Sequence, residues 1–152
     1  MCNVPKLLKK GVRVTIGTDS VASNNSLNFI EEMKFFAALP KGVFHDPTAV
    51  TPKEVLFAAT SQGALAQGRK NCGKMKVGYQ ADLIVLDIGK ANMQPVYELQ
   101  NNIVYSASGS DVILTMVDGR VLYDNGSYPT LDLEQIFYHV SRQINKITET
   151  IA

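Results

Sequence analysis

The sequence predicts an α/β chain made of three successive segments. In residues 1–72, apolar residues recur mostly at helical spacing, between residues that start or stop helices. In residues 73–127, turns rich in glycine and asparagine separate short apolar runs that are typical of strands. Residues 128–152 carry one long amphipathic helical pattern. We therefore expect helices first, short strands next and a single helix at the end.

One strand is expected early, within the helical segment. Apolar and polar residues alternate over 12–16, which is the period of a strand. This strand follows a helix end at Pro5–Lys10 that Gly11 stops, and it leads into Gly17-Thr18-Asp19 and a polar loop. A helix over about 27–39 comes next, and Pro40 and Gly42 are expected to close it.

Local signals place the remaining elements. Thr51-Pro52-Lys53-Glu54 predicts a helix start with a capping box, and a short helix of small residues follows near 62–67. The apolar run inside 81–87 predicts a buried strand. Asp118-Gly119 predicts a two-residue hairpin turn, and Asn125-Gly126 predicts a second turn.

The last segment is expected to be an amphipathic helix that Asp132 caps. Its apolar residues fall at helical spacing and are Leu133, Ile136, Phe137, Val140, Ile144, Ile147 and Ile151.

Composition excludes several classes of function. The formal net charge is +1, and no basic stripe or acidic block suggests a nucleic-acid partner or a solvating tail. No apolar run approaches the ~18 residues of a membrane span, and the order of apolar and cationic residues near the N-terminus does not fit a signal peptide. Two cysteines without a C-x-x-C pairing indicate free thiols in a reducing, cytoplasmic compartment.

The candidate site is Asp19, at the end of the predicted strand 12–16. Loops at the carboxyl ends of strands carry the sites of α/β proteins, and a carboxylate there can bind a metal or take up a proton. The commoner use of such an aspartate is to cap the next helix or brace a turn. The two histidines, His45 in a predicted loop and His139 in the last helix, form no H-x-H or H-E-x-x-H motif, and the chain has no Walker loop.

Four stretches together resemble a known family. They are residues 12–25, with G-T-D-S-V-A-S-N-N; residues 73–87, with V-G-Y-Q-A-D-L; residues 103–112, with S-A-S-G-S-D; and the hairpin at 117–120 with Asn125-Gly126. In this order and spacing they resemble the C-terminal part of amidohydrolases of the subgroup that holds methylthioadenosine/S-adenosylhomocysteine deaminases and triazine chlorohydrolases. The first and third stretches lean toward the deaminases.

The resemblance implies a fold and a reaction. Residues 1–72 would be the last β/α portion of a TIM-type (β/α)8 barrel, residues 73–127 strands of a small β-sandwich with the segment that returns to it, and residues 128–152 a terminal helix. The family hydrolyses an amine or chloride from an N-heterocycle such as an adenosine analogue, with zinc or iron as its metal. Asp19 matches the aspartate that binds this metal and moves a proton of the attacking water.

Three hypotheses follow for the chain. In the first hypothesis, the chain is a C-terminal fragment that is inactive by itself, because the other metal ligands of the family are absent from its sequence. In the second, it is a non-enzymatic assembly module that forms homo-oligomers through an exposed barrel edge and the last helix. In the third hypothesis, a second chain supplies the missing ligands. For Asn24 and Asn25, bracing the loop through its own backbone is the expected use, and no substrate-binding residue is predicted.

Overall fold

The computed structural model describes residues 2–151. Met1 and Ala152, which end the predicted segments 1–72 and 128–152, lie outside the described residues, as does the side chain of Ile151. The helices are α1 (Val4–Lys9), α2 (Val21–Asn24), α3 (Phe29–Phe44), α4 (Pro52–Ala59), α5 (Ser61–Ala66), α6 (Leu99–Asn101) and α7 (Leu133–Ile151), with the short turns η1 (Ala91–Met93), η2 (Asn102–Ser106) and η3 (Gly109–Asp111). The strands are β1 (Leu83–Leu86), β2 (Val112–Val117) and β3 (Arg120–Asp124).

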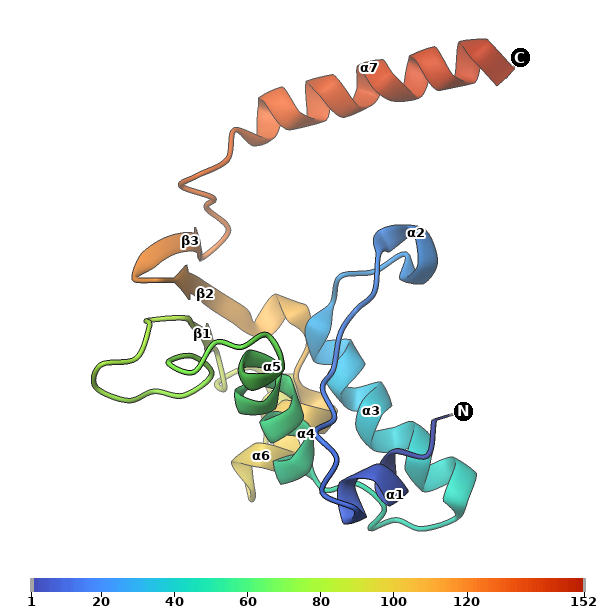
Figure 1. Cartoon of the computed structure of the whole chain (residues 1–152). Coiled ribbons are helices and arrows are strands. Elements are labelled where there is room, and N and C mark those ends of the chain that lie inside the picture. Colours follow the sequence, from blue (N-terminus) through green and yellow to red (C-terminus); the bar gives the residue numbers. More distant parts are fainter. Residues whose placement is uncertain (1, 152) are drawn as a thin grey trace.

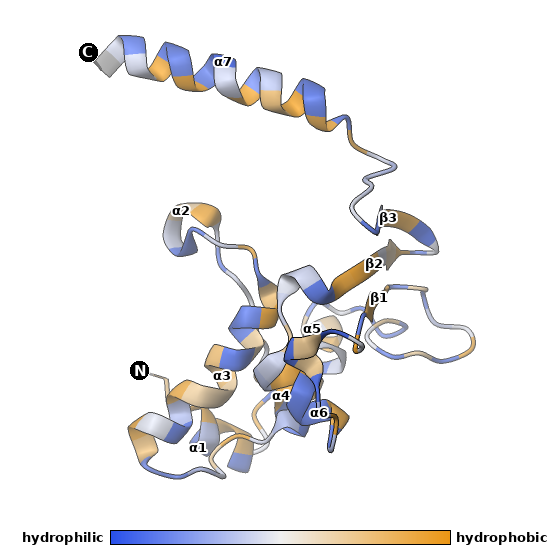
Figure 2. Cartoon of the chain, turned by 180° about the vertical axis from the view of Figure 1, so that it is seen from behind, coloured by the Kyte–Doolittle hydropathy of each residue, from blue (hydrophilic) through white to orange (hydrophobic). Residues whose placement is uncertain are grey.

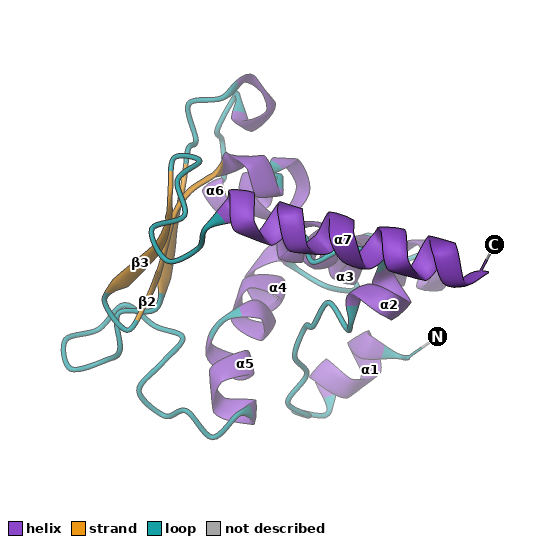
Figure 3. Cartoon of the chain, turned by 90° about the horizontal axis from the view of Figure 1, so that it is seen from above, coloured by secondary structure: helices purple, strands orange, loops and turns teal. Residues whose placement is uncertain are grey.

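Helices and strands occupy separate parts of the molecule. Figure 1 shows α1 and α3 to α6 gathered in one body, the sheet at the side of that body, and α7 standing apart from both. Figure 3, seen from above, shows the strands confined to one side of the molecule. Helices before residue 70 and one helix at the end follow the predicted order, but α6 and the turns η1 to η3 lie between β1 and β2, where the sequence predicts strands.

The predicted strand at 12–16 does not form. Residues 12–20 contain neither helix nor strand, although they follow α1 and its stop at Gly11, whose φ of 69° is left-handed, as expected. A strand needs a hydrogen-bonded neighbour, and no described segment pairs with this one. Ile16 still packs against the core, so apolar contact without a ladder places this segment beside α3.

Helix α3 extends beyond its predicted end. Pro40 lies inside the helix, which ends at Phe44 with His45 in a left-handed conformation at φ 51°. A proline inside a helix removes one backbone hydrogen bond and usually breaks it. Here Pro40 is buried on the same face as Ile30, Met33 and Ala37, so packing of that face outweighs the lost bond.

The core lies between α3, α4 and η2. Its buried members are Ile30, Met33, Ala37, Val50, Val55 and Val104. The predicted capping box begins α4: Glu54 donates its backbone N–H to Thr51 Oγ1 at 3.3 Å, and Glu54 Oε2 accepts from Thr51 N at 2.7 Å. The short helix expected near 62–67 is confirmed as α5.

The three strands form one antiparallel sheet in the order β1-β2-β3. The predicted hairpin is confirmed, since Asp118 and Gly119 both have positive φ, at 50° and 78°. The predicted strand at 83–86 is also confirmed, but its predicted burial is wrong, because Ile84 and Val85 are 49% and 41% exposed. Consecutive side chains of a strand point to opposite faces of the sheet, so the exposure of both residues shows that β1 is only partly covered on each face.

Helix α7 is amphipathic and largely uncovered. Asp132 caps it as predicted, with Oδ1 accepting from Gln135 N at 2.9 Å. Phe137 is 65% exposed and Ile144 55% exposed, and Figure 2 shows apolar residues along the side of α7 that faces the rest of the chain. Neither α7 nor any other helix within residues 2–151 is both long and apolar enough to cross a bilayer.

Candidate functional site

Asp19 lies on the loop that joins the extended segment 12–16 to α2. Its side chain is exposed, and its backbone φ of 58° is left-handed, a conformation that few residues other than glycine adopt. Oδ1 accepts a hydrogen bond from the backbone N–H of Ser20 at 2.7 Å. The loop itself therefore orients the carboxylate through Oδ1.

Asn24 ties this loop to α3. Its amide nitrogen Nδ2 donates to the carbonyl oxygen of Thr18 at 2.9 Å and to Oε1 of Glu32 at 2.7 Å. The bond to Thr18 is the bracing of the loop by its own backbone that the sequence predicts for these asparagines. Asn25, at φ 61°, ends α2 in a left-handed conformation and accounts for the turn back toward α3.

The segment 106–111 lies against the start of α3. Asn28 Oδ1 accepts from the backbone N–H of Glu31 at 3.4 Å, which caps α3. A Cβ added to Gly109 would lie 3.1 Å from this same oxygen, so a larger residue would require Asn28 to shift by a few tenths of an ångström. The stretch 103–112 therefore contacts the start of α3, three residues beyond the end of the stretch 12–25.

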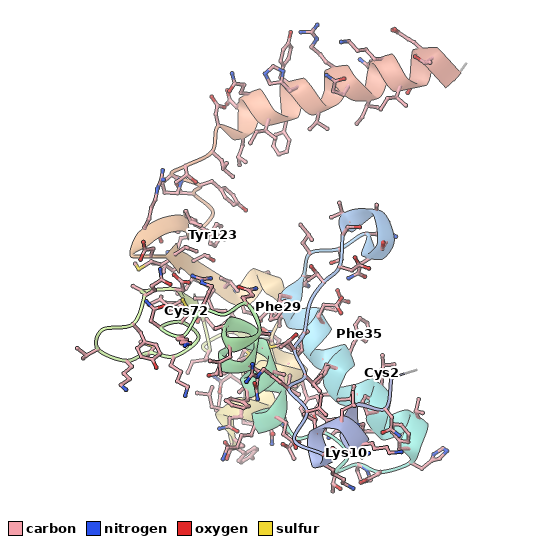
Figure 4. All side chains as sticks on the ribbon, in the orientation of Figure 1. Cys2, Lys10, Phe29, Phe35, Cys72 and Tyr123 are labelled. Carbon is pink, nitrogen blue, oxygen red and sulfur yellow. The ribbon has the colours of Figure 1, made fainter. Side chains whose placement is uncertain are left out.

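A shallow hollow lies between the extended segment and α3. It measures about 250 Å³ and is lined mostly by apolar side chains, among them Ile16, Phe35, Phe36 and Leu39. Figure 4 shows Phe35 projecting from α3 on the same side as Cys2, which also lines the hollow. Its open shape and apolar lining are features of an uncovered packing surface more than of a site for a small polar ligand.

Residues 2–151 hold no group of three His, Cys, Asp or Glu side chains that could bind a metal ion. His45 ends α3 and His139 lies on α7, so neither joins Asp19. The carboxylate of Asp19 fits a zinc or iron ion as one donor, because it is exposed and carboxylate oxygen is an ordinary ligand of both metals. A complete catalytic zinc site needs about three protein ligands.

Two other carboxylates are structural. Asp111 is 1% exposed; its Oδ2 accepts from Ser108 N at 2.8 Å and from Asn92 Nδ2 at 2.7 Å, and Lys90 Nζ lies 3.3 Å from its Oδ1. The Ser108 N–H, followed by Asn92 and Lys90, holds the pKa of Asp111 below its usual value in spite of burial. Asp111 therefore fixes the segment 108–111 that reaches Asn28.

Asp82, the aspartate of the A-D-L stretch, holds a second polar cluster. Its Oδ2 pairs with Arg69 Nη2 at 2.6 Å, and the backbone N–H of Asp118 is the main cause of its lowered pKa. The buried Cys72 thiol donates to Gln80 Oε1 at 2.6 Å, and burial raises its pKa, which makes it an unreactive thiol. Both cysteines are free, as predicted. No motif in the sequence indicates this cluster or the Asp111 network as polar centres, because their members lie far apart in the chain.

Comparison with known proteins decides the family. The model of the amidohydrolase family matches residues 1–122, which is most of the chain. This chain belongs to the amidohydrolase family. The resemblance inferred from the four stretches is thereby confirmed.

Curated relatives of this amidohydrolase chain are named as deaminases. It is 44% identical over 140 residues to the 5-methylthioadenosine/S-adenosylhomocysteine deaminase of Dictyoglomus thermophilum, covering 92% of this chain and 33% of the relative. It is 46% identical over 133 residues to the 5'-deoxyadenosine deaminase of Methanosarcina acetivorans, covering 88% of this chain and 31% of the relative. The chain thus spans about a third of the length of the relatives it matches.

Solved structures agree with this assignment. An adenosine deaminase from Xanthomonas campestris with bound zinc superposes with a TM-score of 0.93 at 29% identity, over 98% of this chain and 34% of its own length. A mutant of the atrazine chlorohydrolase from Arthrobacter aurescens TC1, complexed with zinc and atraton, superposes with a TM-score of 0.85 over 93% of this chain and 32% of its own, at 23% identity. The second comparison shows the fold alone.

Proposed function

We propose that this chain is the C-terminal part of a metal-dependent deaminase that acts on an adenosine-type nucleoside or a related N-heterocycle, with Asp19 as metal ligand and proton carrier. The observation that carries the proposal is the identity of 44–46% to curated deaminases over about nine-tenths of this chain. The exposed carboxylate of Asp19, at the loop after the extended segment, supports the assignment of that residue.

The chemistry proposed for Asp19 is proton transfer. Ser20 N–H holds Oδ1, so Oδ2 is the atom that accepts a proton from the attacking water and returns it to the departing amine. A zinc or iron ion, when bound, lowers the pKa of a coordinated water toward ~7. The net reaction replaces a ring C–N bond by a C–O bond and releases ammonia.

The proposal includes a place for each segment in the whole fold. Residues 1–72 would be the last part of a (β/α)8 barrel, residues 73–127 part of a small β-sandwich, and residues 128–152 the terminal helix. The unpaired segment 12–16 and the partly exposed Ile84 and Val85 of β1 support this, because further strands would cover the apolar side chains of both. Free cysteines fit the cytoplasm as the location.

A chimaera tests the proposed function. The part of the Dictyoglomus thermophilum deaminase that this chain does not match is joined to this chain, and ammonia release from 5-methylthioadenosine and 5'-deoxyadenosine is measured. The expected result is activity in the chimaera and none in the isolated chain. Asp19→Ala should lower kcat by about 10²–10⁴-fold, whereas Asp124→Ala, which replaces another exposed aspartate, should not.

Two outcomes would count against the proposal. Full activity of the Asp19→Ala chimaera removes Asp19 from the mechanism. Release of chloride from a chlorotriazine without any deamination assigns the chain to the chlorohydrolases instead. Supplying the upstream part as a separate polypeptide, in place of the fusion, tests whether two chains can assemble one site.

We infer assembly as the second candidate function, because the apolar face of α7 is exposed. Phe137 and Ile144 on that face are 65% and 55% exposed. Sedimentation of the isolated chain should then give one defined oligomer that Phe137→Glu dissociates. Asn145→Glu, on the polar side of the same helix, is the control. A monomer, or a mixture of sizes, argues against assembly as the function.

A further inference from the structure

The Asn24 side chain bridges Thr18 and Glu32 and uses both N–H donors of its amide to do so. The Asn24 side chain carries two N–H donors, and they reach Thr18 O at 2.9 Å and Glu32 Oε1 at 2.7 Å. Both partners can only accept, so the amide nitrogen has to face them and the orientation of the side chain is defined. Asn24 and Glu32 are both half-buried, which lessens competition from water.

We propose that Asn24 and Glu32 are positioning residues that set the direction of the Asp19 carboxylate, an inference that rests on the proposed function. Thr18 O and Asp19 N belong to one planar peptide group. A hydrogen bond that holds this oxygen therefore also holds the backbone on which Asp19 turns.

Asp19 needs such a support from outside its own loop. Its left-handed backbone, at φ 58°, is an unfavourable conformation for an aspartate and persists only where neighbouring contacts maintain it. Residues 12–20 have no strand ladder to hold them, and the bond from Ser20 N to Asp19 Oδ1 lies within the loop. The Asn24 bridge connects this loop to a rigid element.

That rigid element is α3. Glu32 is in its first turn, between Ile30 and Met33, which are 5% and 4% exposed in the core. A carboxylate acceptor makes a stronger hydrogen bond than a neutral one. Asp19 is thus connected to the core through the Thr18 carbonyl, Asn24, Glu32 and the neighbouring buried Met33.

A simpler role for Glu32 is to stabilise the N-terminus of α3 through the helix dipole. Glu31 is the matched control, because it is also acidic, is also in the first turn and is exposed. If the dipole is the whole explanation, Glu31→Ala and Glu32→Ala will have the same effect.

The first test uses the isolated chain and needs neither metal nor activity. Hydrogen exchange is measured by NMR at Ser23 N–H and Asn25 N–H, which bond to Ser20 O and Val21 O at 3.0 Å each. Asn24→Ala and Glu32→Ala should each speed exchange about tenfold, the effect of losing one such hydrogen bond. Glu32→Gln keeps an acceptor oxygen and should exchange more slowly than Glu32→Ala. Unchanged exchange in Asn24→Ala would overturn the proposal.

The second test uses the chimaera described above. Asn24→Ala should lower kcat by about 10–100-fold with little change in KM, because misplacement of a reacting group costs rate more than binding. Glu32→Ala should behave alike, the double variant should be no worse than either, and Glu32→Gln should recover most of the loss.

The two tests separate this inference from the proposed function. An active chimaera that keeps its full kcat after Asn24→Ala overturns the positioning role and leaves deamination standing. A chimaera without any activity overturns the proposed function, while the exchange experiment still decides whether Asn24 and Glu32 hold the loop. Equal effects of Glu31→Ala and Glu32→Ala overturn the inference in either test.

Discussion

The Asp82 carboxylate accepts a hydrogen bond of 2.7 Å from the backbone N–H of Asp118, in the turn of the β2–β3 hairpin. Its other oxygen, Oδ2, pairs with Arg69 Nη2 at 2.6 Å. One side chain therefore joins the segment after α5, the start of β1 and the far end of the hairpin. The aspartate of the A-D-L stretch has a structural role in this chain.

Because of this interaction, the folding stability of the chain depends on pH. The pKa of Asp82 is lowered, first by the Asp118 N–H and then by Arg69, so folding favours the charged carboxylate. A lowered pKa contributes stability that is fully present above the ordinary value near ~3.9, and this stability is lost as pH falls through the folded-state value. Asp82→Asn should lower the urea midpoint at pH 7, and its difference from the parent chain should shrink below about pH 4.

The matched control for this prediction is Asp132→Asn, because Asp132 also accepts a backbone N–H, from Gln135 at 2.9 Å, but has no resolved charge partner. Urea titrations at several pH values measure both variants. If the difference in urea midpoint between Asp82→Asn and the unsubstituted chain stays constant from pH 7 to pH 3, the proposed coupling between the pKa of Asp82 and stability is contradicted.

Asp111→Ala should destabilise the chain strongly. The variant leaves the Asn92 amide and the Ser108 N–H without their buried acceptor and Lys90 without its partner. Such a loss costs about 2–4 kcal/mol in free energy of unfolding. Urea unfolding at pH 7 measures it, with Asp124→Ala as an exposed control that should cost less than about 0.5 kcal/mol. Equal losses in the two variants would exclude the buried network as the cause.

Gly73→Ala should be costly for two separable reasons. The residue has φ 73°, and an added Cβ would lie 2.8 Å from Thr60 O and 2.9 Å from the Cα of Ser61. Gly68 has a similar φ of 77° with nothing within 4 Å of the added atom. Gly68→Ala should therefore lose only the backbone cost of about 1–2 kcal/mol, and Gly73→Ala should lose clearly more. Thermal unfolding of both variants measures the difference, and equal losses would rule out a steric contribution.

Elements with local causes could be predicted from the sequence. The capping box of Thr51 and Glu54 and the hairpin turn at Asp118-Gly119 depend on residues within a few positions of one another. The end of α3 could not be predicted, because Pro40 is retained in the helix by burial against segments distant in sequence. The exposure of Ile84 was also missed, because an apolar run does not say which layer covers it.

The same distinction between local and distant causes applies to the candidate site. The pattern predicts Asp19 on a polar loop after a strand at 12–16; the loop is present, the strand is not, and the role of Asp19 stays a prediction. The support of that loop was missed, because Glu32 reaches Asn24 only once α3 has formed. The approach of Gly109 to Asn28 joins residues far apart in the chain, and no periodicity indicates such a contact.

Zinc binding provides the last prediction. The isolated chain should retain far less than one zinc per molecule after desalting, because residues 2–151 hold no cluster of three His, Cys, Asp or Glu side chains, and one exposed carboxylate holds zinc weakly. The chimaera with the upstream part of the deaminase should retain about one. Asp19→Ala in that chimaera should weaken zinc binding by at least about tenfold, since even residues that only orient metal ligands contribute that much. Metal analysis by mass spectrometry measures all three. Stoichiometric zinc in the isolated chain would show that it assembles a site without the upstream part.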